Sequence, residues 1–401
     1  MVRDFLRWYA PYQGPDGRVP CCVDRRGADP VPEHDSHGEF IWAVAEYWRF
    51  TRDDAFLAEM WPRVAAAAEY IGRLRAQRTT EAYRAAGKRA FFGLLPESIS
   101  HEGYAAKPVH SYWDDFFALR GLRDAAILAA QVGDRVRAAH FAVERDELRD
   151  ALHASMAEVM RQHGLDTLPA SVELADFDPN STAIALAPGG ERARLPAAAL
   201  QRTFDRYFEE LRKRRASPPE AYTAYEVRSV EALVLLDQKQ RAHELLDFLL
   251  AEQRPPAWLQ WPEITWADPA APRFLGDLPH GWIASSFLRA ARSFFVYERE
   301  EDAALVLAAG VPEAWLRDGG VRVARLPTWW GRVSYSLRGD GADRVHLSLS
   351  GDLQVPPGGI VVVSPLGRPL RSLSVDGRTS REFDASRATL RGVPAEVVLG
   401  Y

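Results

Sequence analysis

Residues 110–132 read HSYWDDFFALRGLRDAAILAAQV, and this stretch contains the pattern on which most of the chain is built. It begins with polar, acidic and aromatic residues and continues as a long, largely apolar run. A helix that is apolar on most sides is typically buried. Residues at its start belong to the preceding loop, where binding and catalytic groups are often found. We therefore expect functional side chains at the starts of buried helices.

Outward from this stretch, periodicity and helix-breaking residues predict ten helical segments. They cover residues 2–10, 36–51, 53–77, 110–132, 135–162, 181–187, 195–214, 222–238, 240–253 and 280–298. The segments at 53–77, 135–162 and 195–214 carry charged faces, which indicates outer helices, whereas their partners are apolar on more sides. The pattern predicts five outer–inner hairpins around one core.

The loops between these segments are alternately short and long. The short loops cover residues 51–53, 132–134 and 237–239, and the long loops cover 11–36, 78–109, 163–180 and 254–279. If helices alternate in direction, the long loops all lie at the same end of the scaffold. They hold most of the interesting acids, histidines and loop tryptophans, which suggests an active-site cleft at that end.

The residue pattern of the sequence changes after Glu300. Short β-branched runs, separated by Gly, Pro and Asp, appear at residues 321–323, 333–337, 345–349, 360–363, 373–375 and 397–399. Alternation such as Val333, Tyr335 and Leu337 is typical of half-buried strands. We expect a helical domain at 1–300 and a sandwich-like antiparallel β-domain at 301–401.

Charge and composition exclude several classes of protein. A net charge of −5 and a pI near 6.1 give no support for nucleic-acid binding. The chain has no stretch of about 20 uncharged apolar residues, so we expect no membrane span. The start MVRDFLRWYA lacks the apolar run of a signal peptide, and a cytoplasmic location is the default expectation.

No cofactor or metal is expected. Phosphate loops, dinucleotide fingerprints and G-x-S-x-G elbows are absent from the sequence. The two cysteines, Cys21 and Cys22, are adjacent; they exclude a disulfide scaffold, and two thiols alone do not make a zinc site. His34, His37 and Glu39 have loose metal spacing, but a satisfied polar network is the commoner explanation.

Acids combined with tryptophans, without a nucleophile motif, suit sugars. Indole faces stack on pyranose rings, while carboxylates bind hydroxyl groups and supply the acid–base pair for glycosidic cleavage. The catalytic candidates are Glu263, Glu97 and Asp35. The substrate-binding candidates are Glu33, His37, His101, Glu102, Trp113, Asp114, Asp115, Asp178, Tyr225, Glu226, Trp261, Trp266, His280 and Trp282.

These candidates also have structural explanations. Carboxylates beside helix starts often act as caps, which applies to Asp35, Asp114 and Asp178. Glu226, in the first turn of an inner helix, is as compatible with a structural role as with ligand binding. Glu263 is the sharpest candidate because it follows a stiffening proline in a loop that also carries Trp258, Trp261 and Trp266.

Several of these motifs together resemble one known family. They are Asp16-Gly17-Arg18-Val19-Pro20 followed by Asp35, residues 178–187, Trp261-Pro262-Glu263-Ile264-Thr265-Trp266, Gly281-Trp282, and Leu326-Pro327-Thr328-Trp329-Trp330-Gly331. In this order they resemble six-hairpin glycosidases, and most of all the bacterial α-L-rhamnosidases of glycoside hydrolase family 78. The likeness covers nearly the whole chain, although each motif is only moderately specific.

The resemblance implies a mainly α fold, an (α/α)6-type toroid followed by a C-terminal antiparallel β-domain. It also implies an inverting exo-glycosidase that acts on an oligosaccharide or glycoside, with Glu263 as the general base. Trp113, Trp261 and Trp282 would be stacking walls. Five hairpins are visible where the family has six, and the family's general acid lies ahead of the segment matched at Asp16. We therefore expect an upstream part of the same polypeptide; otherwise Glu97 or Asp35 is the acid.

Two alternatives stay open at this point. A non-catalytic or truncated carbohydrate-binding paralogue would use the same aromatic residues without the acid. A polysaccharide lyase or sugar epimerase on a similar α-toroid would favour Tyr, His and Arg, and Tyr104, Tyr112, His101 and His110 keep that option open. Segments 94–102 and 111–116 are richer in acids than the rhamnosidase pattern, which suggests a sister family with its own substrate.

Overall fold

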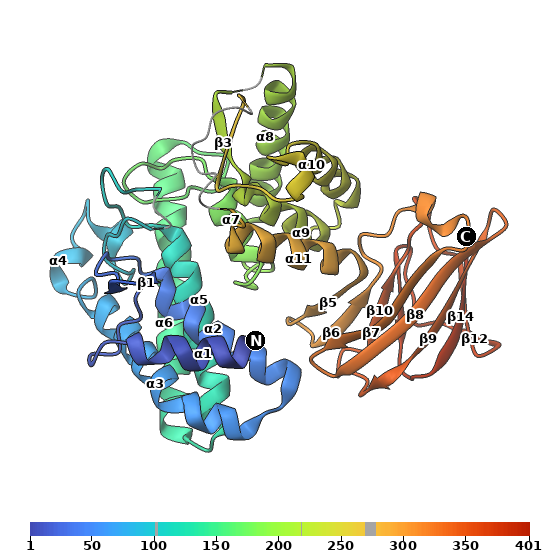
Figure 1. Ribbon diagram of the computed structural model, residues 1–401, viewed down its shortest axis with the longest axis horizontal. Helices are drawn as coiled ribbons and strands as arrows, with labels where there is room; N and C mark the ends of the chain where they lie inside the picture. Colours follow the sequence, from blue (N-terminus) through green and yellow to red (C-terminus); the bar gives the residue numbers. More distant parts are fainter. Residues whose placement is uncertain (101–102, 218, 269–277) are drawn as a thin grey trace. The chain divides into compact units, whose positions relative to one another are not determined.

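The computed structural model describes residues 1–100, 103–217, 219–268 and 278–401 (Figure 1). About 47% of the chain is helical and about 19% is strand, so the mainly α expectation is confirmed. The α-helices are α1 (Val2–Tyr9), α2 (Asp35–Thr51), α3 (Asp54–Ala76), α4 (Glu81–Arg84), α5 (Tyr112–Gln131), α6 (Arg135–His163), α7 (Pro179–Leu186), α8 (Ala197–Ala216), α9 (Val227–Leu235), α10 (Lys239–Ala251) and α11 (Gly281–Phe295).

The helix prediction was wrong at two places. Residues 222–226 form the end of strand β3 (Ala221–Thr223) and a 3-10 turn. They do so because β3 pairs with β4 (Ile264–Trp266), which lies far along the chain. Residues 296–298 belong to strand β5 (Val296–Arg299), which pairs with β6 (Ala304–Leu307). In both places pairing with another segment overrides a local helical pattern. The short helix α4 was not predicted.

The chain divides into two compact units, Met1–Arg212 and Lys213–Tyr401. Each unit is described by itself. The expected domain boundary near residue 300 and the closed ring of hairpins stay predictions.

The first unit is organised around the contact between helices α2 and α5. A Cβ atom added to Gly38 of α2 would lie 2.0 Å from the carbonyl oxygen of Phe117, and one added to Gly121 of α5 would lie 2.7 Å from the Gly38 Cα. No larger side chain fits at these points, so the two glycines allow the helix backbones to touch. This close approach brings the starts of α2 and α5 together.

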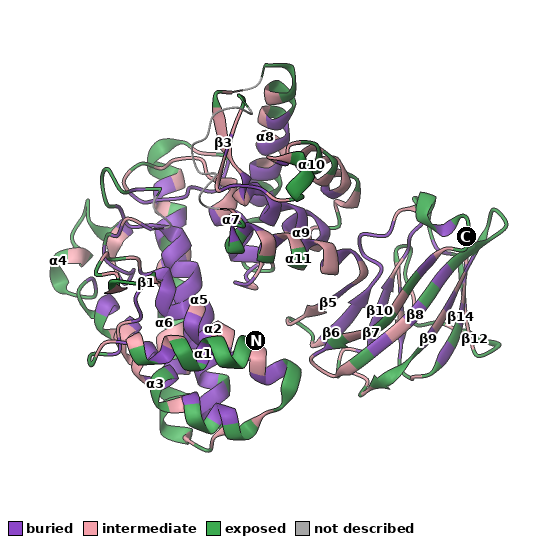
Figure 2. Cartoon of the chain, viewed as in Figure 1, coloured by how far each residue is buried: buried purple, intermediate pink, exposed green. Residues whose placement is uncertain are grey.

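Burial separates inner from outer helices as the sequence predicts. Sixteen of the 20 residues of α5 are buried, whereas only six of the 29 residues of α6 are (Figure 2). Helix α3 packs against both α2 and α5, and the short helix α7 packs against α5. An apolar α5 therefore forms the centre of this unit, and the charged face of α6 lies on its outside.

In the second unit, α9 packs against α10 and α11. Helix α9 is the more buried of this hairpin, as the apolar sequence around Val234 predicts. Over the ranges that the structure describes, no helix has both the length and the apolar character needed to cross a membrane.

The β-domain follows α11 and consists of two sheets. The remaining strands are β7 (Val321–Thr328), β8 (Gly331–Asp340), β9 (Arg344–Leu353), β10 (Ile360–Val363), β11 (Ser372–Val375), β12 (Arg378–Ser380), β13 (Arg387–Leu390) and β14 (Ala395–Gly400). One sheet has the order β12-β11-β14-β9-β8-β7 and the other β13-β10-β6-β5. The six-stranded sheet is antiparallel throughout. In the other sheet, β10 runs parallel to β6, so the expectation of purely antiparallel pairing was wrong there.

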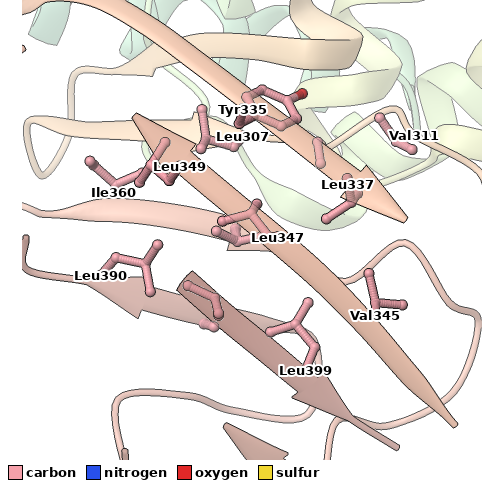
Figure 3. Packing of buried hydrophobic residues seen from close by; sticks show 14 of the residues in the cluster. Leu307, Val311, Tyr335, Leu337, Val345, Leu347, Leu349, Ile360, Leu390 and Leu399 are labelled. Atoms are coloured by element: carbon pink, nitrogen blue, oxygen red, sulfur yellow. The ribbon is translucent and has the colours of Figure 1, made fainter. Parts of the chain in front are cut away.

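Both sheets contribute to a single apolar cluster (Figure 3). Leu307 of the four-stranded sheet and Leu337, Leu347 and Leu399 of the six-stranded sheet are all fully buried in it. The alternating residues of β8 face this core with Val333, Tyr335 and Leu337, while their neighbours face outward. The β-domain is thus held together mainly by apolar burial, which stabilises a fold without providing chemistry.

Candidate active site

The starts of α2 and α5 bring two buried carboxylates together. Asp35, in the first turn of α2, is 3% exposed, and Asp114, in the first turn of α5, is 1% exposed. The Trp113 indole N–H donates to Asp35 Oδ2 at 2.8 Å, which ties the two helix starts directly. The hydroxyl of Ser98 donates to Asp114 Oδ2. Hydrogen bonds therefore connect the loop that carries Ser98 and the start of the inner helix α5 to the buried acids, as the sequence pattern predicts.

The environment of Asp114 favours its protonated form. Burial raises its pKa well above the ordinary value, and the nearby charge of Asp35 raises it further, while the Ser98 hydrogen bond opposes the shift. Asp114 Oδ1 has no hydrogen-bond partner among the described residues. A proton on that oxygen relieves the repulsion between the two carboxylates. The pair can therefore hold a proton under conditions where an ordinary aspartate has lost it.

Asp115, the neighbour of Asp114, holds the preceding loop. The Leu95 backbone N–H donates to Asp115 Oδ1 at 3.0 Å, and the residue is fully buried. Burial raises the pKa of Asp115 to about 7, against the opposing effects of the Leu95 hydrogen bond and the Arg75 charge. Its contacts are those of a residue that positions the loop over residues 94–100.

Glu97 belongs to a second, charged group. Its carboxylate forms an ion pair with Arg78, and the side chain is 50% exposed. Arg78 Nε donates to His110 Nε2 at 2.9 Å, and His110 Nδ1 contacts Glu173 Oε1 at 2.7 Å. A hydrogen bond from its own backbone N–H, together with Arg78, holds the pKa of Glu97 below its usual range although partial burial opposes this. Glu97 is thus kept ionised, which suits hydroxyl binding better than proton donation.

His34, the N-cap residue of α2, and His37, in its first turn, are both buried. Burial lowers the pKa of His34 to about 4 and that of His37 well below its ordinary value. The backbone N–H of Val19 donates to His37 Nδ1 at 3.2 Å, so the His37 proton is on Nε2. Glu33 is half-buried in the same segment. His101 and Glu102 lie outside the described residues.

Asp178 occupies the N-cap of α7. Its Oδ1 accepts from the Asn180 backbone N–H and its Oδ2 from the Ser181 hydroxyl, both at 2.9 Å. Both carboxylate oxygens therefore take part in capping, the structural role weighed for this residue. The neighbouring Asp176 accepts hydrogen bonds from Tyr104 and Ser171.

In the second unit, Glu263 lies directly before strand β4. Its backbone carbonyl accepts from the Ala224 N–H at 3.1 Å, and its side chain is half-buried. The β3–β4 ladder pairs Tyr222 with Thr265 and so holds this loop next to the 3-10 turn that contains Tyr225 and Glu226. The tryptophan–glutamate loop is thus anchored to the start of α9 by its backbone.

Aromatic residues gather beside this loop. Tyr225 lies 5.6 Å from His280 and 6.5 Å from Trp282, measured between ring centroids. The Arg228 guanidinium is 4.6 Å from the Tyr225 ring and 4.8 Å from that of Trp282, and its contact with both fixes their orientation. Trp282 is 40% exposed, so it retains an accessible face.

The other tryptophans expected as stacking walls lie inside the protein. Trp261 is 3% exposed, and its indole N–H donates to the Leu249 carbonyl at 2.7 Å. Trp113 is 1% exposed and holds Asp35, as described above. Trp266 is half-buried in β4. Of the three walls, Trp282 is the one with a substantially exposed side chain.

Glu226 is neutralised by a residue that the sequence did not single out. Arg214, near the end of α8, binds both carboxylate oxygens of Glu226 at 2.6 Å. The sequence likewise missed Arg78, Glu173 and Arg228 as members of these groups. Arg228 lies one helical turn after Tyr225, a spacing that predicts contact; the other contacts join distant segments.

No metal centre is formed by the described side chains, among which no three His, Cys, Asp or Glu residues gather closely enough to hold an ion.

Comparison with solved structures identifies the fold. The chain matches an α-L-rhamnosidase from Dictyoglumus thermophilum with a TM-score of 0.52 and 9% identity, over 100% of this chain and 43% of that one. It matches a family 78 rhamnosidase from Bacillus sp. GL1 with a TM-score of 0.52 and 16% identity, over 90% of this chain and 36% of that one. In fold, the chain resembles the family 78 rhamnosidases.

The chain spans less than half the length of both rhamnosidases. No protein-family model and no curated protein sequence matches it. At this level of identity the likeness concerns the fold, and the chemistry has to be argued from the residues of this chain.

Proposed function

We propose that this chain is a carbohydrate-active protein that hydrolyses a glycosidic bond by an inverting acid–base mechanism. The observation that carries the proposal is the buried Asp35–Asp114 pair in a rhamnosidase-like fold. Inverting hydrolysis needs a carboxylic acid that protonates the leaving oxygen and a carboxylate that activates water. The raised pKa of Asp114 meets the first need. For the second, Glu263 stays the base that the family resemblance implies, on sequence grounds alone.

Within this proposal, Asp35 and Asp114 share the donated proton. Both are nearly inaccessible in the present arrangement, so a substrate oxygen would have to replace one of their hydrogen-bond partners. Glu97, kept ionised by Arg78, binds sugar hydroxyls instead of acting as the acid. Trp282, with Tyr225 beside it, offers an exposed aromatic face on which a pyranose ring can stack.

The experiment is a hydrolysis screen with aryl glycosides, α-L-rhamnosides first, followed by NMR of the first-formed anomer. Glu263→Gln should lower turnover by about 10²–10⁴-fold without changing the thermal midpoint, because the amide cannot accept a proton from water. Glu382→Gln, an exposed carboxylate of the β-domain, is the matched control. A Glu263→Gln variant with full turnover would exclude this residue as the base.

A second candidate function is non-catalytic glycan binding. The ion pairs of Glu97 with Arg78 and of Glu226 with Arg214 favour it, because neutralised carboxylates can still accept hydroxyl hydrogen bonds. Isothermal titration with oligosaccharides separates the two functions. Binding that is unaffected by Glu263→Gln, with no release of reducing sugar, would support the non-catalytic alternative.

The two tyrosines considered for lyase chemistry, Tyr104 and Tyr112, give that alternative less support than the carboxylates give hydrolysis. The Tyr112 hydroxyl contacts the Ser155 hydroxyl at 2.8 Å, and the Tyr104 hydroxyl donates to Asp176. Burial raises the pKa of both phenols, which opposes their use as bases. Unsaturated products that absorb in the ultraviolet would nevertheless identify a lyase in the same screen.

A further inference from the structure

The two cysteines of the chain lie in a segment that the proposed glycosidase chemistry does not use. Cys21 and Cys22 are adjacent in sequence, and their sulfur atoms are 3.1 Å apart. Cys22 is exposed and Cys21 is half-buried. The sequence contains no other cysteine. Each thiol therefore has one intramolecular partner of its own kind, already within contact distance.

The surrounding backbone holds the pair in place from both sides. The Tyr9 hydroxyl donates to the Pro20 carbonyl and lies 3.3 Å from that of Cys21. The Asp29 N–H donates to the Cys22 carbonyl at 2.9 Å, which continues the hairpin formed by Val23–Asp24 and Gly27–Ala28. These hydrogen bonds order the backbone and keep the two sulfur atoms close. Forming a bond between the sulfur atoms therefore costs little additional chain entropy.

We propose that Cys21 and Cys22 form a vicinal dithiol that a hydroperoxide converts reversibly into a disulfide. This proposal does not rest on the proposed glycosidase activity. Adjacent cysteines rarely bond to each other because their Cα atoms, about 3.8 Å apart, are closer than in ordinary disulfides. The same mismatch predicts that the bond is readily reduced, as expected of a reversible site.

The two thiols have different parts in the reaction. The exposed Cys22 sulfur attacks the peroxide: an S–O bond forms, the O–O bond breaks, and the sulfenic acid and an alcohol, or water from hydrogen peroxide, are produced. The Cys21 sulfur then attacks the Cys22 sulfur, forming the S–S bond and breaking the S–O bond. The departing hydroxide takes the Cys21 proton and leaves as water. The thiols lose two electrons, which the peroxide gains.

The assignment of Cys22 as the first-reacting thiol rests on exposure and electrostatics. Burial raises the pKa of the Cys21 thiol, and the charge of Glu33 adds to this effect. Thiolate, the reactive form, is therefore scarce at Cys21. The contact between Cys21 and Cys22 compensates for this low thiolate fraction, because a resolving thiol held next to a sulfenic acid acts at high effective concentration.

The segment is also linked to the candidate active site. Val19, close before Cys21, donates its N–H to His37 of α2. Val19 is two residues before Cys21 and contacts the buried helix that carries Asp35. A change in backbone conformation at residues 21–22 would therefore occur close to that contact.

The test treats the full 401-residue chain with hydrogen peroxide and measures the intact mass without reductant. We expect a loss of about 2 Da, located by peptide mapping to Cys21–Cys22 and reversed by dithiothreitol. A gain of about 32 Da on Cys22 with a free Cys21 thiol, or disulfide-linked dimers as the main product, would overturn the proposal. So would the absence of any reaction under conditions that oxidise a free cysteine peptide.

Single serine variants provide the matched controls. Neither Cys21→Ser nor Cys22→Ser should form the product that is lighter by about 2 Da, and both should keep the wild-type circular dichroism spectrum. Phenylarsine oxide, which bridges two thiols, provides a second probe. It should bind the wild-type chain at least about 100-fold more tightly than either variant, because two thiols act together. Equal binding by all three proteins would mean that the sulfurs do not act as a pair.

Discussion

Asp114 lies in the first turn of α5 and Asp124 in its second half, and both carboxylates are almost completely buried. Their surroundings differ. Asp124 contacts two guanidinium groups, with Arg120 Nε donating to Asp124 Oδ2 at 2.8 Å and Arg49 Nη1 donating to the same oxygen at 3.2 Å. Asp114 faces another carboxylate and hydroxyl groups instead.

This difference reverses the protonation of the two groups. Burial acts to raise the pKa of Asp124, but the charges of Arg120 and Arg49 outweigh it and lower the pKa below its usual value. At Asp114 burial and the Asp35 charge act in the same direction. Equal burial thus accompanies a lowered carboxyl pKa at one position and a raised one at the other, because the neighbouring charges differ in sign.

The largest expected effect comes from removing the charge that balances the two arginines. Asp124→Asn should lower the free energy of unfolding by about 3–5 kcal/mol, because Arg49 and Arg120 remain buried with reduced compensation. Guanidinium denaturation at pH 7, followed by tryptophan fluorescence, measures it. Asp146→Asn, whose side chain is 56% exposed, should show no resolvable change. A loss below about 1 kcal/mol at Asp124 would mean that this network is solvated.

At Asp114 we expect the opposite balance between stability and activity. Asp114→Asn should change the free energy of unfolding by less than about 1 kcal/mol, because an amide resembles the protonated acid. Turnover of a responsive glycoside should fall by about 100-fold or more, because the proton donor is lost. Asp150→Asn on the outer helix α6 is the control. Unchanged turnover in Asp114→Asn would assign the pair a structural role only.

The third test concerns the dependence of stability on pH. Burial raises the pKa of Asp115 to about 7, so the native state binds its proton more tightly than the unfolded chain does. This contribution to stability is present below about pH 4 and is lost as the pH rises through about 7. Between pH 4.5 and 6.5, wild-type stability should therefore fall relative to that of Asp115→Asn, by at most about 3 kcal/mol. Urea denaturation at both pH values measures the difference; parallel behaviour would contradict the shift.

The smallest expected effect concerns the hydroxyl that bonds Asp114. Ser98→Ala should lower the free energy of unfolding by about 1 kcal/mol and raise the pKa of Asp114 further, because the removed hydrogen bond favours the ionised form. A carboxyl titration by carbon-13 NMR measures the pKa. Ser171→Ala, which removes a hydrogen bond to Asp176 instead, is the comparison variant. A lower pKa in Ser98→Ala would show that the Ser98 hydroxyl does not stabilise the charge.

The sequence by itself determined where the inner helices α2 and α5 begin. The polar-to-apolar change before residues 112–131 and the Gly and Pro breaks are local signals, and local signals specify helices reliably when burial agrees with them. They also predicted acidic and aromatic residues at the starts of these inner helices, and there the Trp113 indole N–H donates to Asp35. The short strand β3 escaped prediction because its partner β4 is distant in sequence. Strand β5 escaped it because it follows α11 directly and pairs with the adjacent β6.

Only the tertiary structure decided what each buried acid does. Asp114 and Asp124 lie on one helix with similar burial, and nothing local to α5 says that Arg49 of α2 reaches one of them and Asp35 of α2 affects the other. In the same way, Trp261 and Trp282 were indistinguishable in the sequence, yet one is a core residue and the other is exposed. The physical reason is that charge stabilisation and exposure depend on neighbours brought together by folding, which a one-dimensional pattern does not contain.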